Sequence, residues 1–481
     1  MNTLKLLVIP VCIFFSISLQ AQTIDFGISN KGSEFAELVA DEGGNFYTTS
    51  LIKTTLYMSL VDYKLSRFEN MTKVAEGKIQ RDLHKGKGEF FGTICLDGKL
   101  IVILSNTEKT TTSMYYQVYD KQCKPVSEPT LIAEFAVEEK KSKRGSFRYM
   151  TSQNKQFLLF QYLKKGKKAD EDRLVYKILS SDFTVVQEGE YGTGENISGS
   201  TLTNNGDYLI ASSVSTSGTG KIESYKIKYF KDGIETDLKV DVENKMQYSF
   251  NMSVTDDNQL ILLGAFSEAQ QKGFAYININ LETGKETKRA YCIPNTGLKI
   301  EYVRDYFMDQ DGGLVVLVEE YSEKTTTTNY SNGSMTVKTT YNYGAASAFK
   351  IKDHGDAEWV VKMPKHQNSV NDGGMASSLA SYHNDGKYYL FFNDNLKNYE
   401  ADGSFLDPET VETCFYKSKK CGFIKVEIDL KSGENQRQMM LKPSVQPLFA
   451  IPDYFVKMED RNEMLVYFTN KKTEQFGLMK F

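Results

Sequence analysis

Two short polar segments of the sequence hold the side chains best suited to chemistry. The segment PKHQNSVNDGG, residues 364–374, offers a lysine, a histidine, a glutamine and a carboxylate, and the segment NDN, residues 393–395, offers carboxylate and amide oxygens. Such side chains exchange hydrogen bonds with the hydroxyl, amide and carbonyl groups of a peptide or a sugar. The candidate binding residues are Lys365, His366, Gln367, Asp372, Asn393, Asp394 and Asn395.

A structural role for the same residues stays open, because Asn and Asp side chains often satisfy the backbone of the loop that carries them. A metal site is not expected. The chain has four histidines, and His84, His354 and His383 fall in segments away from His366. No cluster of cysteine and histidine has the spacing of metal ligands, and we expect no cofactor.

Two cysteines lie close enough in sequence to form a local disulfide. Cys414 and Cys421 enclose the segment FYKSKK, and such a pair is a disulfide candidate in an oxidising compartment. A metal site at this pair would need two further ligands, and no histidine lies near it in the sequence. The cysteines Cys95, Cys123 and Cys292 are expected to be buried apolar residues.

Local motifs for catalysis are missing from the sequence. It contains no G-x-S-x-G nucleophile elbow, no H-E-x-x-H zinc motif and no phosphate-binding loop. The paired carboxylates of a glycoside hydrolase come from separate parts of the chain and leave no local motif, so a site of that kind stays open. The 58 basic and 62 acidic residues give a net charge of −4, and this balance predicts no nucleic-acid partner.

Residues 1–21 have the pattern of a secretory signal peptide. One lysine precedes the apolar run 6–17, small and polar residues follow it, and cleavage is expected near Ala21. The apolar run is short for a bilayer span, and no later segment is apolar enough to cross a membrane. We therefore expect a secreted or periplasmic protein of the cell envelope.

A strand–turn–strand pattern recurs along the rest of the chain, and a looser pair of strands follows each occurrence. The first six turns are about 54 residues apart, and the last two spacings are longer by about 20 residues. The Asn, Asp and Gly residues of these turns suit two-residue β-hairpins. The turns are marked by Gly44, Gly98, Asn154, Gly206, Asn258, Gly312, Gly386 and Asn462.

Four antiparallel strands per unit, repeated without helices, predict an all-β fold of the β-propeller class. We expect eight blades, with seven as the alternative, in a single domain over residues 22–481. The segment TIDFGIS at 23–29 is a strand without a hairpin of its own. It is expected to join the last blade, which would close the ring and remove an open sheet edge.

Two long insertions account for the longer spacings, at about 321–345 and 393–421. In a four-stranded blade the chain alternates direction, so both insertions lie on the same face as the connection 364–374. Long loops on a rigid scaffold are where function is often found. The insertion-bearing face around the sixth and seventh blades is therefore the expected contact surface.

The stretch 341–398 resembles secreted propeller-like proteins of Bacteroidetes. Shared features are a strand with a tryptophan, a Pro-Lys-x-Gln loop, an Asn-Asp-Gly-Gly and a Phe-Asn-Asp-Asn, whereas the GAAS at 344–347 departs from the polar or acidic residues often found there. The resemblance implies a propeller fold and an envelope location, and it carries no activity. The matching residues are Trp359, Pro364, Lys365, Gln367, Asn371, Asp372, Gly373, Gly374, Phe392, Asn393, Asp394 and Asn395.

These observations favour a secreted, non-catalytic propeller that acts as a binding scaffold for a protein or a glycan at the bacterial cell envelope. The alternative hypothesis is a glycan-active hydrolase or lyase with acidic residues around the central channel. Inward-facing carboxylates at the channel would favour the enzyme.

Overall fold

The computed structural model describes residues 24–481 except 32–34, 42, 53–61, 85, 138–144, 165–171, 193–195, 217–219, 269–270, 299–301, 331–333, 408–409, 417, 459–460 and 471. The signal peptide expected at 1–21 lies outside the described residues. Within the described part, no helix is long and apolar enough to cross a membrane.

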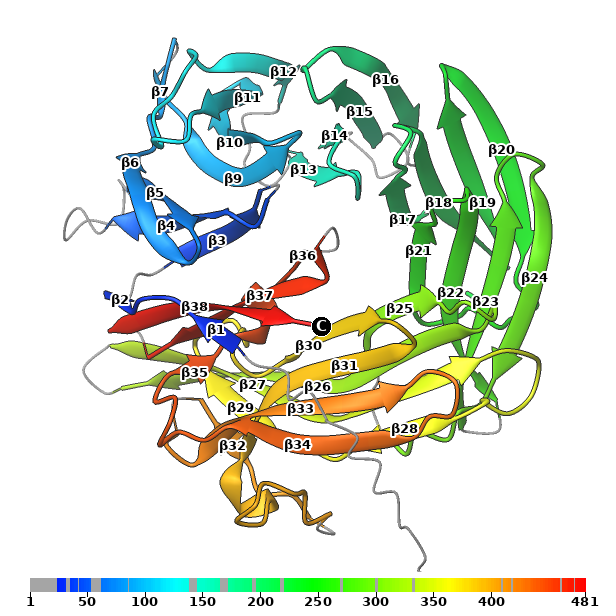
Figure 1. Cartoon of the computed structure of the whole chain (residues 1–481). Coiled ribbons are helices and arrows are strands. Elements are labelled where there is room, and N and C mark those ends of the chain that lie inside the picture. Colours follow the sequence, from blue (N-terminus) through cyan, green and yellow to red (C-terminus); the bar gives the residue numbers. More distant parts are fainter. Residues whose placement is uncertain are drawn as a thin grey trace, which may run out of the picture.

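Eight β-sheets of four or six strands, arranged around a central axis, make up the described part of the chain (Figure 1). The prediction of an all-β propeller is confirmed, and the number of sheets agrees with eight units rather than seven. A further two-stranded ribbon, β7 (Asp82–Leu83) and β8 (Gly86–Lys87), lies between the first two sheets in sequence.

The first five sheets each contain four consecutive strands in antiparallel order. The first sheet consists of β3 (Phe35–Ala40), β4 (Phe46–Ile52), β5 (Asp62–Glu69) and β6 (Thr72–Lys78). The second consists of β9 (Glu89–Leu96), β10 (Lys99–Thr107), β11 (Thr111–Tyr119) and β12 (Thr130–Ala136). The third consists of β13 (Ser146–Thr151), β14 (Phe157–Lys164), β15 (Arg173–Ser180) and β16 (Val185–Gly192). The fourth consists of β17 (Asn196–Leu202), β18 (Tyr208–Ser215), β19 (Ile222–Lys231) and β20 (Ile234–Asp241). The fifth consists of β21 (Phe250–Val254), β22 (Gln259–Glu268), β23 (Gln271–Asn280) and β24 (Lys285–Cys292).

The last three sheets contain additional strands or are accompanied by short helices. The sixth contains β25 (Tyr302–Met308), β26 (Leu314–Asn329), β27 (Met335–Ile351), β28 (Val360–Met363), β29 (Gln367–Val370) and β32 (Cys414–Phe415). The seventh contains β30 (Leu379–Asn384), β31 (Lys387–Asn395), β33 (Cys421–Asp429) and β34 (Asn435–Leu441), with the short helix η3 (Leu396–Asn398) after β31. The eighth contains β35 (Phe449–Ala450), β36 (Val456–Met458), β37 (Glu463–Thr469), β38 (Thr473–Lys480), β1 (Ile24–Phe26) and β2 (Asn30–Lys31), with the short helix η4 (Pro452–Tyr454) after β35.

The core lies between neighbouring blades, because the central strands are apolar on both faces. In β10, Leu100 and Val102 pack toward the first sheet, whereas Ile101 and Ile103 pack toward the third. Alternate residues of a strand point to opposite faces of its sheet. Each inner strand of this kind therefore packs against the blades on both sides of its own, which explains the long apolar runs in each repeat.

The N-terminal strand lies in the last sheet, as the sequence predicted. Strand β1 pairs antiparallel with β38, and Ile24 is opposite Met479. Beyond this pairing, Gln475 Nε2 donates to the backbone carbonyl of Gly27 at 2.7 Å. The eighth sheet therefore combines strands from both ends of the described chain.

Candidate functional site

Three separate segments form one small sheet beside the sixth and seventh blades. We call it the accessory sheet; it consists of residues 322–329 of β26, residues 335–343 of β27, β29 and β32. Strand β29 pairs antiparallel with β27, and β32 pairs parallel with β29. The segment 364–374 was expected to be a simple connection between blades, but four of its residues form β29 because β27 offers them a free edge.

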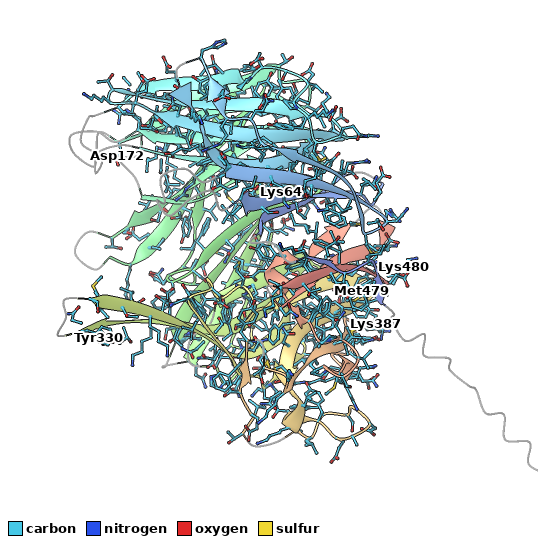
Figure 2. All side chains as sticks on the ribbon, turned by 90° about the vertical axis from the view of Figure 1, so that its left-hand side faces the viewer. Lys64, Asp172, Tyr330, Lys387, Met479 and Lys480 are labelled. Atoms are coloured by element: carbon cyan, nitrogen blue, oxygen red, sulfur yellow. A yellow bond between two sulfur atoms is a disulfide. The ribbon has the colours of Figure 1, made fainter. Side chains whose placement is uncertain are left out.

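The hairpin of the accessory sheet projects well beyond the blades, with Tyr330 near its tip (Figure 2). The insertion expected at about 321–345 lies in this hairpin. Its pairing runs in unbroken register from Tyr321 opposite Tyr343 to Asn329 opposite Met335. The hairpin is therefore a continuous two-stranded ribbon that the base of the accessory sheet holds in place.

A disulfide fastens the far edge of the accessory sheet to the seventh blade. Cys414 of β32 and Cys421 of β33 are joined, with their Cα atoms 5.7 Å apart. The sequence had offered this pair as a disulfide candidate. The other described cysteines, Cys95, Cys123 and Cys292, are buried.

A buried ion pair lies beneath the accessory sheet. The Nζ atom of Lys365 lies 2.5 Å from Oε1 of Glu319, and both side chains have 0% exposure. Arg304 approaches the second oxygen of Glu319 at 3.2 Å. Burial lowers the pKa of Lys365, and the charge of Glu319 opposes this shift. Lys365 is therefore a buried structural cation rather than an exposed donor.

Gln367 and Asn393 connect three successive blades through hydrogen bonds. The Nε2 atom of Gln367 donates to the backbone carbonyl of Asn393 at 2.8 Å, and Lys365 Nζ donates to Oε1 of Gln367 at 2.9 Å. The side-chain amide of Asn393 donates to the carbonyl of Ala450 at 2.8 Å. The sequence placed these segments as neighbours, and the structure joins them directly.

Asp394 is the centre of a second buried polar cluster, at the base of the 393–421 insertion. Arg437 forms an ion pair with its carboxylate, and the hydroxyl of Tyr399 donates to Oδ2 at 2.9 Å. The side-chain amide of Asn398 donates to Oδ1 at 3.0 Å. Burial raises the pKa of Asp394, and the positive charge of Arg437 opposes that rise. All of these contacts are internal to the insertion and its blade.

The remaining candidate residues also have protein partners. Asn395 donates to the carbonyl of Thr413 at 2.7 Å, and Nδ1 of His366 lies 2.9 Å from the hydroxyl of the same threonine. Oδ1 of Asp372 accepts from Ser369 Oγ at 2.8 Å. All seven candidates thus have partners within the protein, and those of His366, Gln367, Asp372 and Asn395 lie in or beside the accessory sheet.

An open groove lies where the hairpin meets the insertion. It encloses about 700 Å³ and is lined by residues that include Tyr321, Asn342, His366 and Val411. Of the seven candidate residues, His366 and Lys365 contribute to its lining, and the Lys365 side chain is fully buried. His366 is thus the candidate that the structure leaves in reach of a ligand.

Two buried carboxyl groups with raised pKa values, one on an innermost strand and one in a short helix, were not predicted from the sequence. Glu37 lies on β3, the innermost strand of the first sheet (Figure 1), and burial raises its pKa to about 7. Burial likewise raises the pKa of Asp453, in η4, to about 6. Burial raises the pKa of Tyr454, and the charges of Asp453 and Glu37 add to that rise. No local motif marks these residues, because they come from blades at opposite ends of the sequence.

The substitution Glu37→Gln is expected to stabilise the protein at alkaline pH. Oε2 of Glu37 accepts a hydrogen bond from the backbone N–H of Thr93 at 2.5 Å, which a glutamine preserves. Because the folded-state pKa is about 7 instead of 4.5, the wild type loses stability as the pH rises between these values. At pH 8 the variant should be more stable by about 2 kcal/mol, after allowance for water around the half-buried carboxylate.

Urea unfolding at pH 4.5 and pH 8 measures this difference. The two proteins should have nearly equal free energies of unfolding at pH 4.5, where the carboxyl group is protonated in the fold. The exposed residue Glu89, at the start of β9, provides a matched control, and Glu89→Gln should change neither value appreciably. Equal stabilities of Glu37→Gln and wild type at pH 8 would contradict the assignment.

No group of three or more His, Cys, Asp or Glu side chains in the described part of the chain is arranged to hold a metal ion.

No family model and no curated protein matches the chain. Among solved structures, the WD40 domain of SCAP from fission yeast is similar, with 8% sequence identity and a TM-score of 0.42 over 96% of this chain and 95% of that chain. The β-propeller domain of the trilobed protease from Pyrococcus furiosus has 11% identity and a TM-score of 0.39 over 76% of this chain and 90% of that chain. The eight sheets themselves define the fold, and these similarities add nothing on function.

Proposed function

We propose that this chain is a secreted, non-catalytic propeller scaffold that binds another protein at the bacterial cell envelope through its accessory sheet. The observation that carries the proposal is the accessory sheet itself. Two insertions and the connection 364–374 combine to build it, and the disulfide Cys414–Cys421 and the buried ion pair of Lys365 and Glu319 fasten it to the blades. A rigid protrusion binds with little loss of conformational entropy.

The tip of the hairpin has the composition of a protein contact. Met335 is 63% exposed, Tyr330 is 51% exposed and Val337 is 45% exposed. Large apolar and aromatic side chains on a fixed, exposed element are typical of interaction surfaces. The location at the envelope is supported by the signal-peptide pattern at 1–21 and by the disulfide, because disulfides persist in oxidising compartments.

Shortening the hairpin is expected to abolish partner binding without unfolding the propeller. Residues 325–339 are replaced by Asn-Gly, so that Lys324 and Thr340 close a two-residue turn. The pairing of β29 with Thr340–Tyr343 is retained in this variant. Affinity capture from native cell envelopes should recover a stoichiometric protein with the wild type and lose it with the variant, while the thermal midpoint stays nearly unchanged.

A pair of substitutions at the tip provides a finer version of the same experiment. Met335→Ser with Val337→Ser should weaken capture about tenfold or more, since each buried apolar side chain contributes strongly at an interface. Ile234→Ser removes an equally exposed apolar residue from the distant fourth blade and should leave capture intact. Retained capture by the shortened hairpin, or release of the partner by free oligosaccharides, would contradict the proposal.

A glycan-active enzyme is the second candidate function. The observation that favours it is the presence of two buried carboxyl groups, Glu37 on the innermost strand β3 and Asp453 in η4, with pKa values raised to about 7 and about 6. A carboxylic acid that keeps its proton near neutral pH is suited to general acid catalysis. Glycan cleavage by the wild type that Glu37→Gln abolishes would establish this candidate over the scaffold.

A further inference from the structure

The projecting half of β26 has one edge without a neighbouring strand. Strand β25 borders β26 only as far as Glu319, which is opposite Tyr302, and β27 occupies the other edge. Among the residues that the structure describes, no strand borders 322–329 on the outer side. This segment, SEKTTTTN, contains no proline, and natural proteins usually protect an exposed edge of this length.

The register identifies the backbone groups that point outward along this edge. The N–H of Tyr330 donates to the carbonyl of Ser334 at 2.9 Å, so even-numbered residues of β26 bond to β27 in the unbroken register. The N–H and C=O groups of Glu323, Thr325 and Thr327 therefore point away from β27. The outer edge of β27 is consistent with this register. Thr339, which is opposite Thr325, points its N–H away from β26 and donates to Asn371 Oδ1 at 2.7 Å.

The two faces of the hairpin differ in charge and polarity. Lys324 is opposite Thr340, and Lys338 is opposite Thr326, so both lysines are on one face because residues opposite each other share a face. That face carries no carboxylate within 322–329 and 335–342. The other face of the tip carries the exposed apolar residues Met335 and Val337. A strand added at the edge would present alternate side chains to these two faces.

We propose that the outer edge of β26 binds an extended strand of a partner protein in which acidic and apolar side chains alternate. The partner strand bonds to the backbone of Glu323, Thr325 and Thr327. Its acidic side chains lie beside Lys324 and Lys338, and its apolar side chains lie on the face of Met335 and Val337. The inference rests on the proposed function, and it specifies how that partner is recognised.

A proline pair tests the strand addition. Thr325→Pro with Thr327→Pro removes two outward N–H groups that β27 does not use, and proline is tolerated at such edge positions. The matched control, Thr325→Val with Thr327→Val, keeps both groups. The probe is a nine-residue synthetic peptide of alternating valine and glutamate, measured by fluorescence anisotropy against the full-length chain, with alternating valine and lysine as the reference peptide.

The wild type and the valine pair should bind the valine–glutamate peptide equally, and the proline pair should bind it about tenfold or more weakly. The valine–lysine peptide should bind at least about tenfold more weakly to the wild type. As a measurement that needs no variant, hydrogen exchange at the amides of Glu323, Thr325 and Thr327 should slow when the valine–glutamate peptide is added.

Three results would overturn strand addition. Each of them can be told apart from a failure of the proposed scaffold function. The first is a wild type that does not bind the valine–glutamate peptide, and the second is equal binding by the proline pair. If the shortened hairpin still loses its envelope partner in either case, the scaffold function stands and only this mode of recognition falls. The third is a dimer of the wild type that the proline pair converts to a monomer, which would assign the edge to a second copy of the chain.

Discussion

Replacement of Arg437 by alanine is expected to lower the free energy of unfolding by about 3–5 kcal/mol. The guanidinium forms an ion pair with Asp394, whose side chain is completely buried. It also donates to the carbonyl of Pro364 at 2.7 Å and to the hydroxyl of Tyr399 at 2.7 Å. Alanine at this position would leave a buried carboxylate without its counter-charge. Removing one partner of a buried ion pair destabilises a protein far more than replacing both partners.

Urea unfolding at pH 7 measures this loss, and two variants serve as controls. Lys397→Ala breaks the exposed ion pair with Glu412 in the same insertion and should cost less than about 1 kcal/mol. The double variant Arg437→Ala with Asp394→Asn should recover part of the stability, because it removes the unpaired charge. A loss of less than about 1 kcal/mol for Arg437→Ala alone would contradict the expected cost of leaving Asp394 as an unpaired buried charge.

The substitution Glu319→Gln is expected to destabilise the protein by a similar amount, about 3–5 kcal/mol at pH 7. Lys365 would keep its fully buried position but lose the carboxylate that offsets its positive charge. Arg304 would lose the same partner. The neutral glutamine has nearly the same shape, so the change tests the charge of the pair rather than its packing.

The destabilisation should shrink as the pH is raised from 7 toward 10. Burial already lowers the pKa of Lys365 below its ordinary value, and loss of Glu319 removes the charge that opposes this shift. A lysine whose folded-state pKa lies below the unfolded value gains stability as the pH rises toward that unfolded value, about 10.4. Glu323→Gln, on the exposed part of the same strand, is the matched control, and a pH-independent loss would contradict the assignment.

The sequence was sufficient for the fold because every blade repeats the same local chemistry. Turn residues such as Asp97 and Gly98 have positive φ angles of 48° and 69°, as the two-residue hairpins require. The apolar runs between the turns are then long enough for strands that are buried on both faces. The extra N-terminal strand was predictable for a simple reason, since the eighth unit lacked a fourth strand.

The candidate site was predicted in position but not in organisation. Residues such as Gln367 and Asn393 were expected to be neighbours, and a hydrogen bond joins them. The strand β29 was not expected, because four residues carry too weak a local signal and form a strand only when β27 lies beside them. The charge partners Glu319 and Arg437 were also missed, since each comes from a different strand, and pairing across strands depends on the folded register.

The pairing of β1 with β38 has a consequence for the order in which the protein folds. Sheets one to five can each form from consecutive strands, so their contacts are local and can develop while later residues are still being made. The eighth sheet cannot, because a hydrogen bond between Gln475 and Gly27 joins residues 448 positions apart. Until β1 pairs with β38, the outer edge of β38 stays open to strands of other chains. The last blade to assemble is therefore the one in which folding competes most directly with aggregation.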